Sequence, residues 1–193
     1  MMRQQEVVPA GNEWREANLR MLKGSVVDRI GSGWMLITAG DVRTDKGAWN
    51  TMTASWGALG VIWNMDVAIC LVRPSRHTFS FINKVDSYSL SFFDGQREAL
   101  NVCGSMSGRD TDKAAAAGLT PIVFPDAAVG FKEATEVISC GKLYTHDLAP
   151  AHFLDKEIAK NYPDGDYHRL FIGRVLSLHF KEDAQGAGRR TGV

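Results

Sequence analysis

The sequence predicts a mainly β fold with peripheral helices (α+β), in which antiparallel strands form a closed or nearly closed sheet. Strand-like apolar runs recur along the chain, whereas helical patterns are few. Strands and helices do not alternate regularly, as they would in a doubly wound parallel sheet. The sequence also contains no Gly-x-Gly-x-x-Gly turn, so a Rossmann-type nicotinamide site is not indicated and any pyridine nucleotide must bind differently.

Composition predicts one core and a neutral surface. The chain has 193 residues with 45% hydrophobic content, enough for one substantial core without a second domain. Lysine plus arginine and aspartate plus glutamate number 22 each, which gives no net charge at pH 7. This balance argues against an extended nucleic-acid interface or attachment to an anionic membrane.

The cysteines predict a reducing, cytoplasmic location. Cys70, Cys103 and Cys140 are odd in number and lack the paired spacings of zinc or redox sites, so we expect buried free thiols. The histidines show no partner at metal-ligand spacing, and we expect no bound metal. The amino terminus lacks a signal-peptide core, and no apolar run approaches the roughly 20 residues of a membrane span.

Residues 1–31 are interpreted as an N-terminal arm. Asn12 could cap a helix from Glu13 to Lys23, with Trp14, Asn18 and Met21 near one face. Such an arm would pack on the domain or on a second subunit; a disordered leader is the alternative.

Strand patterns dominate residues 32–181, which we interpret as a single domain. A turn is expected at Asp41–Gly47, after the first clear strand. Residues 87–93 alternate with period two, as a sheet with one wet face should, and the apolar run 67–72 is too short for a buried helix. The expected strands are 34–40, 48–56, 67–72, 87–93, 136–146 and 168–180.

Three helices are expected between these strands. They span 76–84, 98–106 and 112–117, with Ser75 as cap of the first and Gly118 ending the third. Residues 182–193 are charged and glycine-rich, and we expect a flexible C-terminal tail.

Hydroxyl and guanidinium groups around Pro74 predict an anion site. The first amides of a helix beginning after Ser75 would be free to attract an anion. Arg73 and Arg76 add planar donor groups suited to phosphate oxygens, and the hydroxyls of Ser75 and Thr78 would complete the shell.

The segment 51–57 predicts a neighbouring site for a flat polar ring. Apart from Met52 its residues carry little bulk up to Ser55, so a heterocycle could lie against their backbone and exchange hydrogen bonds with it. The small residues are Thr51, Thr53, Ala54, Ser55 and Gly57.

Four strings, in order, resemble the flavin reductase-like family, whose members are FMN-binding split β-barrels. The strings are Asn50-x-Met-Thr-Ala-Ser-Trp-Gly57, Arg73-Pro-Ser-Arg-x-Thr-Phe79, Ser107-Gly-Arg-Asp-x-Asp-Lys113 and Tyr162-Pro-x-Gly-Asp-Tyr-His168. They lie between about Ile37 and Leu178, and together they are fairly specific although each alone is weak.

The resemblance implies an FMN site formed by the two central stretches. Arg73, Ser75, Arg76 and Thr78 would hold the phosphate, and residues 51–55 the ring. It adds Trp56, Phe79 and Lys113 as cofactor contacts. For Trp56 the alternative is an ordinary core residue, with flavin contact favoured; for Lys113 the alternative, a solvated helix residue, has equal weight. His168 matches the family's histidine near the flavin and nicotinamide, although a structural histidine in this setting is the commoner case.

The resemblance implies an NAD(P)H-dependent flavin reductase that passes hydride from reduced nicotinamide to flavin N5. One alternative is a flavoredoxin-like FMN electron carrier reduced by a protein partner; another is a non-catalytic flavin-binding module. Members are commonly homodimers with the flavin near the interface, so a homodimer is expected. The identity of the final electron acceptor, free flavin or a partner protein, and the choice between NADH and NADPH stay open.

Overall fold

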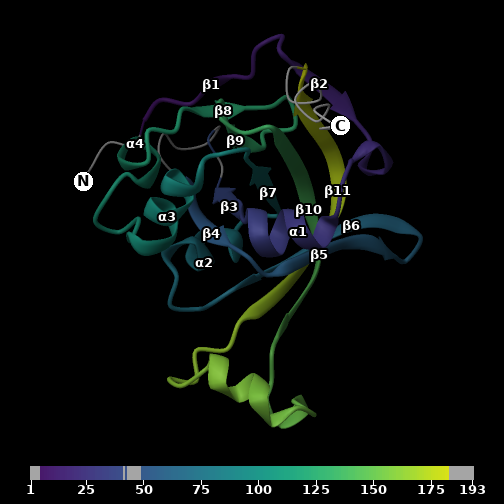
Figure 1. The fold of residues 1–193 in the computed structure, drawn as a ribbon, viewed down its shortest axis with the longest axis vertical. Coiled ribbons are helices and arrows are strands. Elements are labelled where there is room, and N and C mark those ends of the chain that lie inside the picture. The colour runs from purple at the N-terminus through teal and green to yellow at the C-terminus, as the bar shows by residue number, and fades with distance from the viewer. Residues whose placement is uncertain (1–4, 41, 43–48, 183–193) are drawn as a thin grey trace, which may run out of the picture.

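A main antiparallel sheet organises the protein, with helices and a small second sheet around it (Figure 1). The computed structural model describes residues 5–40, 42 and 49–182. Most of the expected turn at Asp41–Gly47 and the tail beyond residue 182 lie outside these residues. The strands dominate the described chain, which confirms the mainly β prediction.

The main sheet has eight strands, seven of them in the order β4-β3-β7-β10-β11-β6-β5, while β2 pairs with β11 off this path. Its strands are β2 (Trp14–Ala17), β3 (Met35–Gly40), β4 (Trp49–Ala54), β5 (Gly57–Ile62), β6 (Met65–Val72), β7 (Ser87–Phe92), β10 (Glu136–Asp147) and β11 (Arg169–Lys181).

Strand β11 has different neighbours along its length. Residues 169–174 pair with β6, residues 178–181 pair with β2, and β10 runs along the opposite edge for nearly the whole strand. Register shifts at Ser139/Cys140 and Lys142/Tyr144 interrupt the β10–β11 ladder. Because such irregularities increase twist and bend a strand, they allow the long ribbon to curve around the core.

The core explains why the apolar runs form strands. Alternate side chains of a strand point to opposite faces; Met35 and Ile37 enter one buried cluster, whereas Leu36 enters a second cluster beneath α3. The Val67–Val72 run is largely buried in β6, as expected for a central strand. The three cysteines are buried free thiols, as predicted.

The N-terminal helix prediction is wrong. Trp14–Ala17 forms strand β2, and a short 3-10 helix follows at Leu19–Met21, capped by Asn18 instead of Asn12. Trp14 is buried against Phe124, and Met21 is exposed, so the two do not share a buried face. Pairing with β11 outweighs the local helical pattern, and this part of the arm packs on its own domain.

Helices pack against both buried clusters of the main sheet, and a second, three-stranded sheet completes the structure (Figure 1). The α-helices are α1 (Val26–Asp28), α2 (His77–Ile82), α3 (Arg97–Ser105) and α4 (Lys113–Ala116). The small sheet is β1-β8-β9, made of β1 (Val8–Pro9), β8 (Pro121–Val123) and β9 (Val129–Phe131). Gly118 ends the α4 segment with a φ of 67°, as its position predicted.

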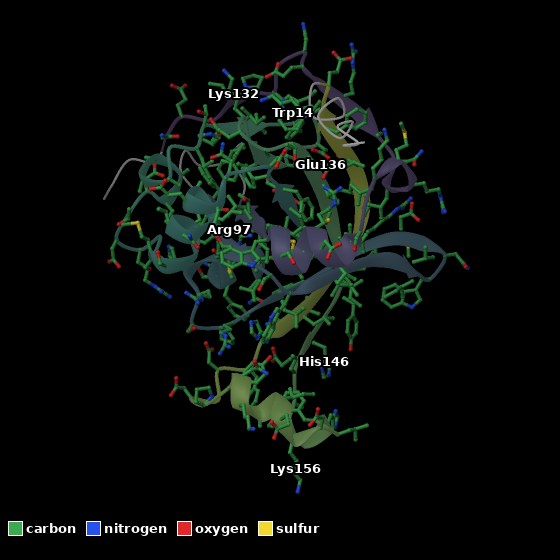
Figure 2. All side chains as sticks on the ribbon, viewed as in Figure 1. Trp14, Arg97, Lys132, Glu136, His146 and Lys156 are labelled. Atoms are coloured by element: carbon green, nitrogen blue, oxygen red, sulfur yellow. The ribbon has the colours of Figure 1, made fainter. Side chains whose placement is uncertain are left out.

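Residues 148–168, here called the excursion, connect β10 to β11 and project from the body (Figure 1). Figure 2 shows His146 near the root and Lys156 at the far end. The excursion contains two 3-10 helices, Pro150–His152 and Lys156–Asn161, and Leu154 is fully exposed. In the part of the chain that the structure describes, no helix has the length and apolar character needed to cross a bilayer.

Candidate functional site

A cavity of about 150 Å³ lies where β4, α2 and α3 meet. We call it the cationic hollow. It is lined by Met52, Thr53, Ser75, Arg76, His77, Thr78, Cys103, Gly104, Ser105, Met106, Ser107, Gly108, Arg109 and Lys113.

Three cations and no carboxylate line the cationic hollow, among the residues that the structure describes. Lys113 Nζ donates to the Cys103 carbonyl at 3.1 Å, and Arg76 Nη1 donates to the Gly104 carbonyl at 3.4 Å. Arg109 Nη1 donates to the Ser75 carbonyl at 3.4 Å. Since all three acceptors are neutral, the hollow has an excess of positive charge that suits an anion.

Lys113 is the most buried of these cations, with 6% of its surface exposed. Burial, with a further contribution from the nearby Arg76 charge, lowers the pKa of Lys113 from 10.5 to about 8. The side chain reaches this position because Asp112 caps α4, accepting a bond from the Ala115 amide at 3.1 Å. A buried ammonium with one carbonyl acceptor is costly unless an anion joins it.

Close backbone packing forms the floor of the hollow. A Cβ at Gly104 would lie 3.3 Å from Thr53 Cβ, and one at Gly108 would lie 2.1 Å from Asn50 Oδ1. Asn50 Nδ2 donates to Thr78 Oγ1 at 2.8 Å, which ties β4 to α2. The two glycines therefore let α3 and the following loop approach β4 closely.

A second, more open hollow of about 320 Å³ adjoins the first. We call it the neutral hollow, because it is lined by Trp34, Thr53, Ala54, Ser55, Leu100, Asn101, Gly104 and Ser105. Thr53, Gly104 and Ser105 border both hollows. The two hollows are therefore neighbours, as a single ligand that contacts both would require.

The structure brings eight of the thirteen candidate site residues to these hollows. They are Met52, Thr53, Ala54, Ser55, Ser75, Arg76, Thr78 and Lys113. Thr78 is 1% exposed, and its oxygen already accepts from Asn50. The remaining five are Thr51, Trp56, Arg73, Phe79 and His168.

Thr51 and Phe79 point into the protein interior. The Thr51 hydroxyl donates to the Ile37 carbonyl at 3.2 Å and lies 2.9 Å from the Thr38 hydroxyl. Phe79 packs edge to face on Phe171 at a centroid distance of 6.3 Å. Both side chains stabilise the barrel, since strand and helix periodicity turn them away from the hollows.

Arg73 binds the excursion. Arg73 Nη2 donates to the Asn161 carbonyl at 2.8 Å, and its guanidinium stands 5.0 Å from the ring centroid of Tyr162. Ser75 does not cap α2 as predicted: Arg76 occupies that position, and the Ser75 hydroxyl donates to Asp166 Oδ2 at 2.5 Å. The Ser75 amide also donates to Asp166 Oδ1 at 3.3 Å, so this carboxylate of the excursion holds Ser75 in place.

Trp56 and His168 form an aromatic cluster at the base of the excursion. Their ring centroids lie 4.8 Å apart, and Tyr162 Oη lies 2.9 Å from His168 Nδ1. Burial, followed by the Arg73 charge, lowers the pKa of His168 from 6.5 to about 4, so its imidazole is neutral near pH 7. Trp56 is 39% exposed and follows Ser55 in the chain, but none of the three rings lines either hollow.

Sequence reasoning missed His77 and Arg109 as lining residues of the cationic hollow. Burial, then the charge of Arg109, lowers the pKa of His77. The sequence feature that could have identified Arg109 is the string Ser107-Gly-Arg-Asp-x-Asp-Lys113, because it places Arg109 four residues before Lys113. Only Lys113 of that string was selected.

A family profile described as "Flavin reductase like domain" matches residues 27–191. No curated protein shows significant sequence similarity to the chain.

Several solved structures share this fold at low sequence identity. A flavoredoxin from Methanosarcina acetivorans is 22% identical with a TM-score of 0.59, over 78% of this chain and 69% of that one. A protein with a split barrel domain from Shewanella frigidimarina is 21% identical with a TM-score of 0.60, over 80% and 71%. An NADH:FAD oxidoreductase from Streptomyces globisporus is 14% identical with a TM-score of 0.57, over 77% and 80%. These likenesses confirm the predicted split β-barrel.

Proposed function

The chain belongs to the flavin reductase-like family, and from that premise we propose that it binds FMN and acts as an NAD(P)H-dependent flavin reductase. The observation that carries the proposal is the cationic hollow, where three cations without a carboxylate adjoin a neutral hollow. FMN has the same asymmetry, with an anionic phosphate at one end and a planar ring at the other.

The phosphate would bind to Arg76, Arg109 and Lys113. Each of the three cations donates one described hydrogen bond, to a backbone carbonyl. Their other N–H groups can therefore donate to phosphate oxygens. Ser75 and Thr78 also line this hollow, but the Ser75 hydroxyl already bonds Asp166 and the Thr78 hydroxyl already bonds Asn50. Arg73 contributes indirectly, by holding the β6–α2 connection against the excursion.

The ring would lie along Thr53, Ala54 and Ser55 in the neutral hollow. Bound FMN would supply the hydride-accepting ring position, N5, and the nicotinamide would supply the hydride. The chain's task is to hold the phosphate, orient the ring and leave one ring face accessible. His168 is neutral near pH 7, and its ring centroid lies 4.8 Å from that of Trp56, which follows the Thr53–Ser55 segment in the chain; we propose an orienting role for it and no proton transfer.

A flavoredoxin-like electron carrier is the second candidate. It is favoured by the structural likeness to the Methanosarcina flavoredoxin. A carrier would hold FMN tightly and take electrons from a protein partner, so reduction by nicotinamide would be slow or absent. We expect the reductase to oxidise NADH or NADPH rapidly.

We further infer a homodimer in a cytoplasmic compartment, with residues 32–181 as the FMN-binding domain. Three buried free thiols favour a reducing compartment. Exposed apolar side chains on the barrel and excursion, including Trp63 and Leu154, favour self-association. Light scattering of the purified protein measures the oligomeric state; a monomer at all concentrations would contradict the dimer.

Visible absorption of the purified protein with added FMN tests the function. NADH, then NADPH, is added anaerobically. Bleaching of a bound-flavin spectrum by either nucleotide supports the reductase and identifies the donor. A bound flavin that neither nucleotide bleaches supports the carrier, and no bound-flavin spectrum contradicts the FMN site itself.

A further inference from the structure

Trp34 has a backbone conformation that residues other than glycine rarely adopt. Its φ is 67° and its ψ is 167°, in a region populated almost entirely by glycine. It directly follows a π-helical turn, Arg29–Gly33, and its amide donates to the Ile30 carbonyl at 3.2 Å. π-Helical turns and such backbone outliers both concentrate at functional sites. The turn already contains Gly31 and Gly33. A glycine at position 34 would adopt the observed φ and ψ without strain, so the turn would be kept.

Arg97, at the start of α3, holds the Trp34 ring in place; Figure 2 labels Arg97. The guanidinium carbon stands 3.9 Å from the centroid of the indole ring. Arg97 Nη2 also donates to the Ser32 carbonyl, which fixes the guanidinium beside the strained turn. A cation–π contact this close restricts the orientation of a half-buried ring.

Trp34 is one of the residues that line the neutral hollow. Thr53, Ala54 and Ser55 lie in the same lining, and α3 supplies Leu100 and Asn101. All of its lining residues in the described chain are uncharged, whereas the adjoining hollow has three cations. A neutral hollow with a fixed indole suits a planar aromatic ring, because stacking needs surface area and no charge.

We propose that Trp34 is a stacking platform for the planar ring bound over Thr53–Ser55. This rests on the proposed function, in which that ring is the isoalloxazine of FMN. The strained backbone aims the indole at the hollow, and Arg97 keeps it there. Trp34 is therefore a determinant of ring affinity, separate from the cations that determine phosphate affinity.

The two parts can be separated with two ligands. Riboflavin carries the same ring as FMN but no phosphate, so it reports ring contacts alone. Trp34→Ala should weaken FMN and riboflavin by about the same factor, on the order of tenfold as for other stacked aromatic rings. Trp34→Phe should retain most of the affinity for both ligands. Arg76→Ala should weaken FMN but leave riboflavin unchanged.

Trp34→Gly controls for folding. Glycine adopts the observed φ and ψ without strain, so this variant should unfold at a temperature at least as high as Trp34→Ala. Both variants should lose ring affinity equally, because both lack the indole. Circular dichroism follows unfolding, and flavin fluorescence follows binding.

The outcomes distinguish this proposal from the proposed function. If Trp34→Ala and Trp34→Gly fold and bind both ligands as tightly as the unchanged protein, while Arg76→Ala weakens FMN, Trp34 is no platform and the FMN site stands. A loss of FMN affinity with riboflavin unaffected would also overturn the stacking role. If the unchanged protein binds neither flavin, both proposals fail.

Discussion

Arg73 and Arg76 stand three residues apart in one motif, yet they belong to two different regions of the molecule. Arg73 points to the excursion, where its guanidinium donates a hydrogen bond to a carbonyl oxygen and stands over an aromatic ring. Arg76 lines the cationic hollow, where its only described acceptor is a carbonyl at 3.4 Å. The motif provides two cations, but their surroundings decide that one is structural and the other is available to a ligand.

The largest expected effect comes from Lys113→Met, which removes the buried cation. FMN affinity should fall by about 10- to 100-fold, because a charge-assisted hydrogen bond contributes about 1.5–3 kcal/mol. Fluorescence titration measures the affinity. Lys156→Met, at the exposed end of the excursion, is the matched control and should leave affinity unchanged.

Arg76→Ala and Arg73→Ala test the comparison directly. The first should weaken FMN by about tenfold with little change in thermal stability, since Arg76 is exposed. The second should change FMN affinity less, while residues 150–161 become more sensitive to limited proteolysis as the excursion loses its anchor. Equal effects of the two variants on FMN affinity would contradict the assignment of separate roles.

The pKa of Lys113 predicts a pH dependence. The Lys113 ammonium is mostly charged at pH 7 and half charged near pH 8, so FMN affinity should be nearly steady around pH 7 and fall as pH rises through about 8. A bound phosphate would raise this pKa and shift the fall upward. The Lys113→Met variant should show no such fall. An identical alkaline decline in both proteins would assign it to another group.

The smallest effect is expected from Cys70→Ala. Cys70 is fully buried in the main core and outside both hollows. FMN affinity should stay the same, whereas the free energy of unfolding should fall by roughly 1 kcal/mol because a small cavity is left. Chemical denaturation measures this loss. A marked change in FMN affinity would place the core thiol in contact with the site.

Local sequence patterns predicted the central strands well. They failed where pairing with residues far away in the sequence determines the secondary structure. The apolar run in β6 and the alternation in β7 are properties of adjacent residues, so periodicity detected them. Strand β5 was not predicted: the expected strand 48–56 ends before it, and Gly57 and Gly60 weaken its strand pattern. The N-terminal segment was predicted to be helical because its pairing partner, β11, lies over 160 residues away.

The candidate site shows the same limit. Arg76 and Lys113 were identified from their strings, and the structure places both in one hollow. Arg73 and Ser75 were assigned to the same anion, but their partner Asp166 lies about 90 residues further along. Trp34 was expected simply to begin a strand. Its left-handed backbone gives no local signal, because a tryptophan there is atypical.

The pairing of β11 also determines when this protein can fold during its synthesis. Both β6 and β2 require the last strand, as does β10 along its other edge. While residues 169–181 remain in the ribosome, the earlier strands have no partner along these edges. Closure of the barrel is therefore a late event that joins distant segments, and such non-local pairing is slow. Until then the nascent chain exposes unpaired strand edges, so chaperones have most to protect during that interval.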